Sequence, residues 1–145
     1  MGDVLKKVPV REQAPKVRAT NFDEVCLGYN KEEAMEEASR CLTCKNAKCV
    51  QGCPVNINIP AFIKEVKEGN FAEAYKVIGQ SSALPAVCGR VCPQETQCEG
   101  QCVRGIKGEA VSIGKLERFV ADWARENNVA PEMPTEKKGK KVAVI

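Results

Sequence analysis

Cysteine is the residue type in this chain best suited to hold a metal, and eight of its nine cysteines lie in two short runs. The runs read Cys41-x2-Cys44-x4-Cys49-x3-Cys53-Pro54 and Cys88-x3-Cys92-Pro93-x4-Cys98-x3-Cys102. Histidine is absent from all 145 residues. Clustered thiolates are soft ligands that select zinc, copper(I) or iron-sulfur clusters over hard cations. The two runs therefore predict a metal or cluster site built mainly from sulfur.

The spacing of the first run favours iron-sulfur clusters. In two-cluster bacterial ferredoxins, the run C-x2-C-x2-C-x3-C-P gives three ligands to one cluster, and its last cysteine ligates the other. The first run has the same order, although its middle gap of four residues departs from that pattern. We therefore expect Cys53, which precedes Pro54, to turn toward a second cluster. All-cysteine zinc sites also use C-x2-C pairs, but only Cys41 and Cys44 have that spacing, so structural zinc is the alternative.

Composition and charge indicate the compartment in which the protein works and the classes of partner it binds. No apolar stretch approaches the roughly 20 residues of a membrane helix, and no apolar signal segment follows the basic N-terminus, so we expect a cytoplasmic protein. In a reducing cytosol, paired cysteines indicate ligands rather than disulfides. The net charge of +3 does not predict binding to nucleic acid. Cys26 stands alone and is expected to serve as a small apolar side chain.

Helical periodicity surrounds the cysteine runs. Amphipathic helices are expected over residues 31–40, 60–68, 70–79 and 112–127. Asn30 with Glu33, and Asn70 with Glu73, have the spacing of capping boxes at the starts of two of these helices. The last helix has the clearest pattern, with Leu116 on its apolar stripe and Lys115, Arg118, Asp122, Arg125 and Glu126 on its polar side. Glu117 borders the apolar stripe.

The chain divides into four expected parts. Residues 1–20 have no helical or strand period and predict an extended N-terminal arm. Residues 21–130 carry the helices and cysteines, and residues 131–139 form a proline- and lysine-containing linker. Residues 140–145 have the form of a buried parallel strand, which cannot be stable alone. We therefore expect an all-α domain with two cluster-binding cysteine loops, followed by the first strand of a truncated Rossmann-type domain.

Together these residues resemble a known family. Cys41-Leu42-Thr43-Cys44, Cys53-Pro54, Cys88-Gly89-Arg90-Val91-Cys92-Pro93 and Val111 to Glu117 are similar to the N-terminal iron-sulfur domain of the glutamate synthase small-subunit family. That family includes the large subunit of NADH-dependent ferredoxin:NADP oxidoreductase and the N-terminal domain of dihydropyrimidine dehydrogenase. The resemblance covers about residues 1–130 and the strand.

The resemblance implies a ligand set for two [4Fe-4S] clusters in an α-helical ferredoxin-type domain. One cluster would be held by Cys41, Cys44, Cys49 and Cys102. The other would be held by Cys53, Cys92, Cys98 and Glu117, the last in a position where the family has Gln or Glu. Cys88 is then a spare thiol.

The resemblance also implies an electron-transfer role. Family members continue into an FAD domain and an NAD(P)H domain, which would be partners within the same polypeptide, and they pass electrons to a redox centre on a partner subunit. The sequence leaves open whether that subunit belongs to a glutamate synthase or to a ferredoxin:NADP oxidoreductase. The chain itself has no nucleotide-binding fingerprint, so we expect no NAD(P)H oxidation by it alone. A zinc-stabilised helical interaction module and a free-standing ferredoxin are the alternatives.

Overall fold

The computed structural model describes residues 4–132, 135–136, 139, 141 and 143. Its elements in chain order are β1 (Arg11–Glu12), α1 (Pro15–Arg18), β2 (Cys26–Gly28), α2 (Lys31–Ser39), α3 (Lys48–Gln51), α4 (Ile59–Lys67), α5 (Phe71–Gly79), α6 (Pro85–Val91), the 3-10 turns η1 (Gln94–Thr96), η2 (Glu99–Gln101) and η3 (Val103–Ile106), and α7 (Ile113–Glu126). The expected helical domain is confirmed. A small antiparallel pair, β1 with β2, was not expected.

The helix α2 begins as its sequence predicts. The Asn30 side chain accepts a hydrogen bond from the Glu33 backbone amide at 2.8 Å, and the Glu33 carboxylate accepts one from the Asn30 amide at 2.7 Å. This reciprocal pair is the predicted capping box. It fixes the start of the helix whose C-terminal end delivers the chain to Cys41.

The predicted capping box at α5 is wrong. The helix does begin after Asn70, but the Asn70 side chain makes no capping hydrogen bond. Its amide donates instead to the Glu65 carboxylate of α4 at 3.0 Å. Gly69, at φ +81°, reverses the chain between the two helices in a conformation that glycine adopts without strain. The cap is therefore replaced by a bond that ties α4 to α5.

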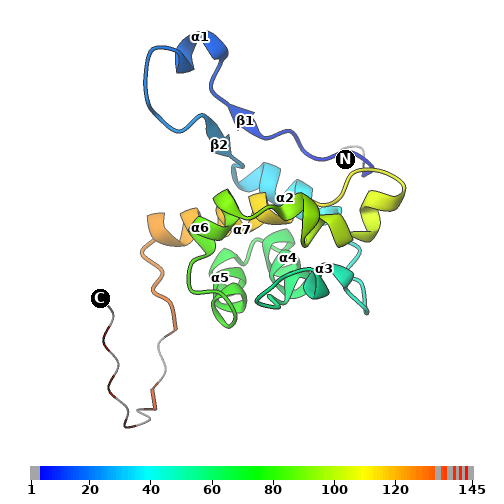
Figure 1. Cartoon of the computed structure of the whole chain (residues 1–145), viewed down its shortest axis with the longest axis vertical. Coiled ribbons are helices and arrows are strands. Elements are labelled where there is room, and N and C mark those ends of the chain that lie inside the picture. The colour runs from blue at the N-terminus through cyan, green and yellow to red at the C-terminus, as the bar shows by residue number, and fades with distance from the viewer. Residues whose placement is uncertain (1–3, 133–134, 137–138, 140, 142, 144–145) are drawn as a thin grey trace.

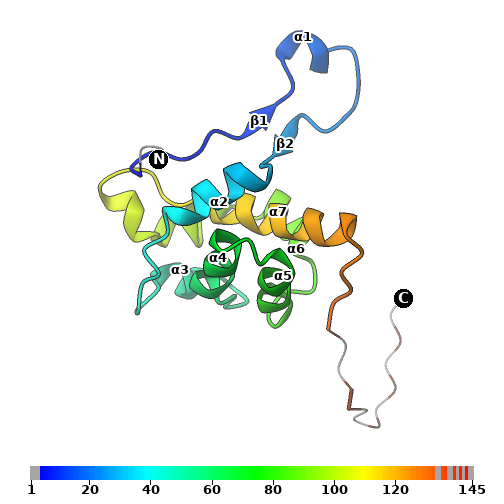
Figure 2. The ribbon, with the colours of Figure 1, turned by 180° about the vertical axis from the view of Figure 1, so that it is seen from behind.

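The core lies where α7 meets the α4–α5 hairpin. Helix α7 passes above this hairpin in both ribbon views, with α2 and α6 on its other sides (Figure 1, Figure 2). Phe62 of α4, Ile78 of α5 and Leu116 of α7 are fully buried. The Phe71 ring contacts the Phe119 ring edge-to-face, with 5.0 Å between centroids. These few aromatic and aliphatic contacts hold the frame that positions the cysteines.

The N-terminal arm differs from its prediction. Residues 1–20 were expected to be extended, but they contain β1 and α1, which project from the helical body with β2 (Figure 1). The part before β1 is fixed by the buried Glu37 carboxylate of α2, which accepts hydrogen bonds from the backbone amides of Val8 at 2.7 Å and Ser112 at 2.8 Å. Arg40 pairs with the same carboxylate. One buried acid thus joins the arm, α2 and the start of α7.

A second correction concerns Arg118, which the helical pattern places on the polar side of α7. Its side chain is buried and donates to the Cys26 carbonyl at 2.7 Å. It also pairs with Glu24 and Asp122. The arginine is buried because α6 and the β1–β2 pair pack over this side of α7, and its charge is compensated there.

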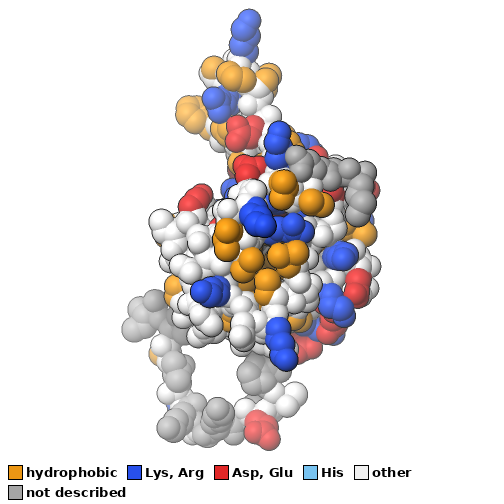
Figure 3. Space-filling view, turned by 90° about the vertical axis from the view of Figure 1, so that its right-hand side faces the viewer, with side chains coloured by type: hydrophobic (Ala, Val, Ile, Leu, Met, Phe, Trp, Pro, Cys, Tyr) orange, Lys and Arg blue, Asp and Glu red, His pale blue; other side chains and the backbone are white. Residues whose placement is uncertain are grey.

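Most of the predicted strand 140–145 and part of the linker lie outside the described residues. Lys141 and Ala143 are described and belong to no regular element. The surface of the helical body carries several exposed apolar side chains, some of which gather on the face shown in Figure 3.

Candidate metal centre

Three cysteines of the first run and the last cysteine of the second share one neighbourhood. Cys41 follows α2, Cys49 lies within α3, and Cys102 lies between η2 and η3. With Cys44 they line a single cavity whose walls include the apolar side chains of Ile63 and Ile113.

The thiol chemistry of this neighbourhood is shaped by burial. Burial raises the pKa of Cys49 to about 11, and the nearby Cys102, Cys41 and Cys44 thiols contribute in the same direction. Burial also raises the pKa of Cys41, while the Thr43 amide, 3.5 Å from its sulfur, opposes the shift. Four sulfurs that interact electrostatically in an apolar cavity favour a cationic metal or cluster, which stabilises the thiolate form.

The other cysteines gather around Glu117. Burial is the main cause that raises the pKa of Cys92 and of Cys98, the latter to about 12. In both cases the Cys53 thiol and the Glu117 carboxylate add to the shift. The Cys88 thiol acts on Cys92 more strongly than either of them. A second neighbourhood therefore contains Cys53, Cys92, Cys98 and Glu117, which the family resemblance groups together, and also Cys88.

Glu117 has the properties of an unsatisfied ligand. Its side chain is 8% exposed, and its Oε1 atom is buried without a hydrogen-bond partner among the described residues. Burial raises its pKa from 4.5 to about 7. A buried carboxyl oxygen without a partner is costly unless a cation or donor satisfies it, so a metal at this position explains an otherwise unfavourable placement.

The two cysteine runs are held together by close backbone packing. Gly52 precedes Cys53, and a Cβ added to it would lie 2.8 Å from the carbonyl oxygen of Gln97, the residue before Cys98. Only glycine allows this approach. The contact places Cys53, the cysteine of the first run that is expected to turn toward a second cluster, beside the second run.

No three Cys, Asp or Glu side chains converge on one point among the residues that the structure describes. Sulfur donors in two groups, with one orphaned carboxylate, fit iron-sulfur clusters, whose ligands bind separate iron atoms.

Comparison with known proteins agrees with this donor chemistry. Residues 18–129 match the family model described as dihydropyrimidine dehydrogenase domain II, 4Fe-4S cluster. The chain belongs to this iron-sulfur family. The expected family resemblance is thereby confirmed.

Relatives of the domain occur in several oxidoreductases. The glutamate synthase [NADPH] small chain of Escherichia coli K12 is 40% identical over 97% of this chain, and the putative oxidoreductase AegA of the same strain is 37% identical over 97%. The subunit PreT of its NAD-dependent dihydropyrimidine dehydrogenase is 38% identical over 86%. The chain spans 30%, 22% and 30% of these relatives, respectively. It is therefore an iron-sulfur domain homologous to one part of larger oxidoreductases.

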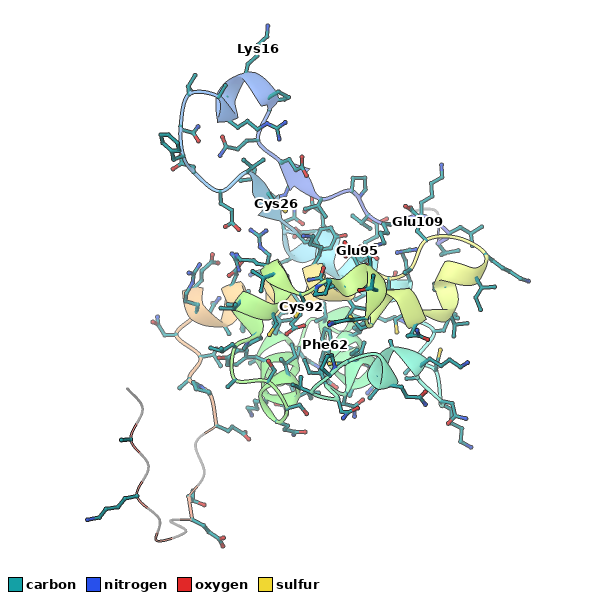
Figure 4. All side chains as sticks on the ribbon, viewed as in Figure 1. Lys16, Cys26, Phe62, Cys92, Glu95 and Glu109 are labelled. Atoms are coloured by element: carbon teal, nitrogen blue, oxygen red, sulfur yellow. The ribbon has the colours of Figure 1, made fainter. Side chains whose placement is uncertain are left out.

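Two cysteines do not belong to the proposed ligand set of this iron-sulfur domain. Cys26 lies on β2 at the base of the projecting arm (Figure 4), where its carbonyl accepts a hydrogen bond from Arg118. Cys88 lies on α6, one turn before Cys92, which follows the helix, and its sulfur is 4.0 Å from the Ser82 hydroxyl. The position of Cys88 leaves its role as a spare thiol a prediction.

Sequence reasoning missed two side chains that position the iron-sulfur domain's second loop. Glu99, between Cys98 and Cys102, is buried and accepts hydrogen bonds from the Lys7 ammonium at 2.7 Å and the Gly114 amide at 3.2 Å. It fixes the loop to both the arm and α7. A lone glutamate between ligands carries no pattern that predicts burial, and Lys7 is 92 residues away in sequence.

Proposed function

We propose that the chain is the electron-transfer domain of a cytoplasmic NAD(P)H-dependent flavin oxidoreductase, of the type represented by the glutamate synthase small chain. It would hold two [4Fe-4S] clusters and relay electrons between FAD, bound in further domains of the same polypeptide, and a redox centre on a partner subunit. The chain alone would not oxidise NAD(P)H.

The carrying observation is the division of the ligand candidates into two neighbourhoods. Cys41, Cys44 and Cys49 line one cavity together with Cys102 from the other run. Cys92 and Cys98 of the second run are each influenced by Cys53 and by Glu117. Two separate donor sets in one small domain support two clusters rather than one.

The residues would set the properties of the bound clusters. Iron-sulfur clusters supply reversible one-electron transfer, and the protein controls burial, charge and ligand type. Glu117 would give one site a harder ligand than thiolate, while the first site has four thiolates beside the Arg104 cation, which acts on Cys41. We expect the two clusters to differ in reduction potential.

Anaerobic reconstitution of the chain tests the proposal. A brown protein with about eight irons, absorbing near about 400 nm and bleached by dithionite, is expected. Glu117→Ala should change the EPR signal of one cluster and leave the other. A colourless protein that binds zinc instead would support the helical interaction module, and unchanged iron content and EPR signals in the variant would exclude Glu117 as a ligand.

A further inference from the structure

An exposed apolar surface lies beside the first cysteine group. It surrounds a hollow of about 220 Å³ lined by Leu5, Leu42, Val103, Arg104, Ile106 and Lys107, which we call the η3 surface. Ile106 is 78% exposed and Leu42 is 50% exposed. Val103 and Ile106 lie three residues apart in a 3-10 turn, which places their side chains in line. Contiguous exposed apolar side chains of this kind are typical of interaction sites.

The charges of the η3 surface are all positive. Arg104 and Lys107 line the hollow together with apolar side chains, and no acidic residue lines it. Within the described part of the chain, neither cation forms an ion pair. Figure 3 shows basic side chains among and around the apolar ones on this face. An apolar centre with unpaired cations is complementary to a partner whose apolar contact is bordered by carboxylates.

The η3 surface is continuous with the cavity of the first cysteine group. Leu42, Val103 and Arg104 line both the surface hollow and the cavity that contains Cys41 and Cys102. A molecule on this surface would therefore be separated from the candidate ligands by a single layer of side chains. That proximity suits electron exchange with the occupant.

The chain that follows α7 leaves from the opposite end of the molecule. Ile113, at the start of α7, lines the cysteine cavity, whereas Glu126 ends this 14-residue helix about 20 Å away. Beyond it, Glu132 pairs with Lys76 of α5 at 3.8 Å. The η3 surface thus faces away from the segment that continues toward the rest of the polypeptide, which favours a separate protein as its occupant.

We propose that the η3 surface is the docking site for a separate electron-transfer protein whose contact face has an apolar centre and an acidic border. The proposal rests on the proposed relay function, because it assigns the partner's position and surface chemistry. Docking there would bring the partner next to the four-thiolate group rather than to the group that contains Glu117.

Site-specific photo-crosslinking in the full-length protein, expressed in its own host, tests this docking. Benzoylphenylalanine in place of Ile106 should crosslink to a second protein that carries a flavin or iron-sulfur cofactor. The same probe in place of Leu84, which is 63% exposed and lies outside the hollow, should not. Crosslinks to a second copy of the chain, to its own later domains or to a protein without a redox cofactor, or no crosslink at all, would overturn the proposal.

A charge reversal makes the test specific. Lys107→Glu should lower the crosslinking yield by about tenfold or more, and a higher salt concentration should also lower the yield. Lys16→Glu, at the tip of the projecting arm (Figure 4), is the matched control and should leave the yield unchanged. An equal loss in both variants would contradict a local contact.

The two proposals fail in different ways. Optical and EPR spectra of the same purified full-length proteins report whether clusters are present. Clusters without a position-specific crosslink at 106 would reject the docking surface and leave the relay standing. A cluster-free protein that still crosslinks would reject the relay, and with it the electron-transfer role of the docked partner.

Discussion

At the scale of single residues, Glu117 places a carboxyl group in apolar surroundings, which is unfavourable for its charged form unless a cation is present. The carboxyl group sits on α7 beside the apolar core, where water cannot solvate its charge, and one of its oxygens has no described partner. Helical geometry placed it at the border of the apolar stripe, and packing of α6 against α7 converts that border into a buried site. Without a ligand, the burial of this carboxyl group should make the free energy of unfolding depend on pH.

In the cluster-free chain, burial raises the pKa of Glu117 from 4.5 to about 7. The folded state therefore holds this proton more tightly than the unfolded state. The stabilisation is fully present below about pH 4.5 and is lost as the pH rises through about 7. Urea unfolding in reducing buffer should show a decrease of about 3 kcal/mol in the free energy of unfolding between about pH 4.5 and about pH 8.

Glu117→Gln is the control for this titration, because it keeps the shape and removes the ionisation. The variant should lack the decrease in the free energy of unfolding that the ionisation of Glu117 causes. Equal pH profiles in the two proteins would show that Glu117 titrates normally.

Cys88 provides a test in which a substituted cysteine should leave both clusters in place. It lies on α6, one turn before Cys92, and acts on the Cys92 thiol, but the proposed ligand set does not include it. Cys88→Ser should keep the iron content and both EPR signals, whereas Cys92→Ser should lose one cluster. Loss of iron in the Cys88 variant, with normal helical circular dichroism, would assign Cys88 to the ligand set in place of Glu117.

At the scale of elements, the contact between α6 and α7 sets the geometry of the second donor group. A Cβ added at Gly89 would lie 2.7 Å from the backbone nitrogen of Arg118, the residue after Glu117. The two helices touch at backbone distance here, so an added Cβ requires α6 and α7 to move apart, and we expect Cys92 to move with α6.

Gly89→Ala should therefore destabilise the domain by about 1–3 kcal/mol and selectively weaken the cluster held beside Glu117. Gly79→Ala is the matched control, since a Cβ at that last residue of α5 meets nothing within 4 Å. Thermal unfolding measures the first effect, and EPR of the reconstituted variants measures the second. Equal behaviour of the two variants would show that the α6–α7 approach can relax.

Some of the helices and their caps could be predicted from the sequence, and others could not. The capping box of α2 and the apolar faces of α4, α5 and α7 follow from local patterns, and the structure has them. Helix α6 escaped prediction because its seven residues are too few to show a period. The Asn70 cap failed because Glu65, on the preceding helix, competes for its side chain.

The ligand set of the candidate site stays a prediction, and the contacts that support the site could not be predicted from the sequence. Family resemblance groups the cysteines and Glu117, and Cys41, Cys44, Cys49 and Cys102 do line one cavity. The Lys7–Glu99 pair and the contacts of Glu37 with Val8 and Ser112 join residues far apart in sequence. Such long-range polar contacts depend on how the finished elements pack, so no local pattern encodes them.

At the scale of the whole molecule, two kinds of interaction hold different regions together. Apolar packing joins α4, α5 and α7 through Phe62, Ile78, Leu116 and the Phe71–Phe119 ring pair, and several cysteines pack only at the edge of this core. The loops over residues 41–53 and 88–102 have few buried large apolar side chains of their own. Because each proposed cluster takes ligands from both runs, cluster binding would crosslink these loops.

Removing the clusters should therefore loosen the molecule unevenly. In hydrogen-deuterium exchange, the cluster-free chain should lose protection over residues 41–53 and 88–102, while the backbone amides of α4 and α5 keep most of theirs. The α4–α5 hairpin serves as the internal control, because it contains no proposed ligand and its buried side chains, such as Phe62 and Ile78, belong to the apolar core. Uniform loss over the whole chain would mean that the apolar core cannot hold without the clusters, and unchanged protection in both loops would mean that their polar contacts, such as Lys7 with Glu99, suffice to order them.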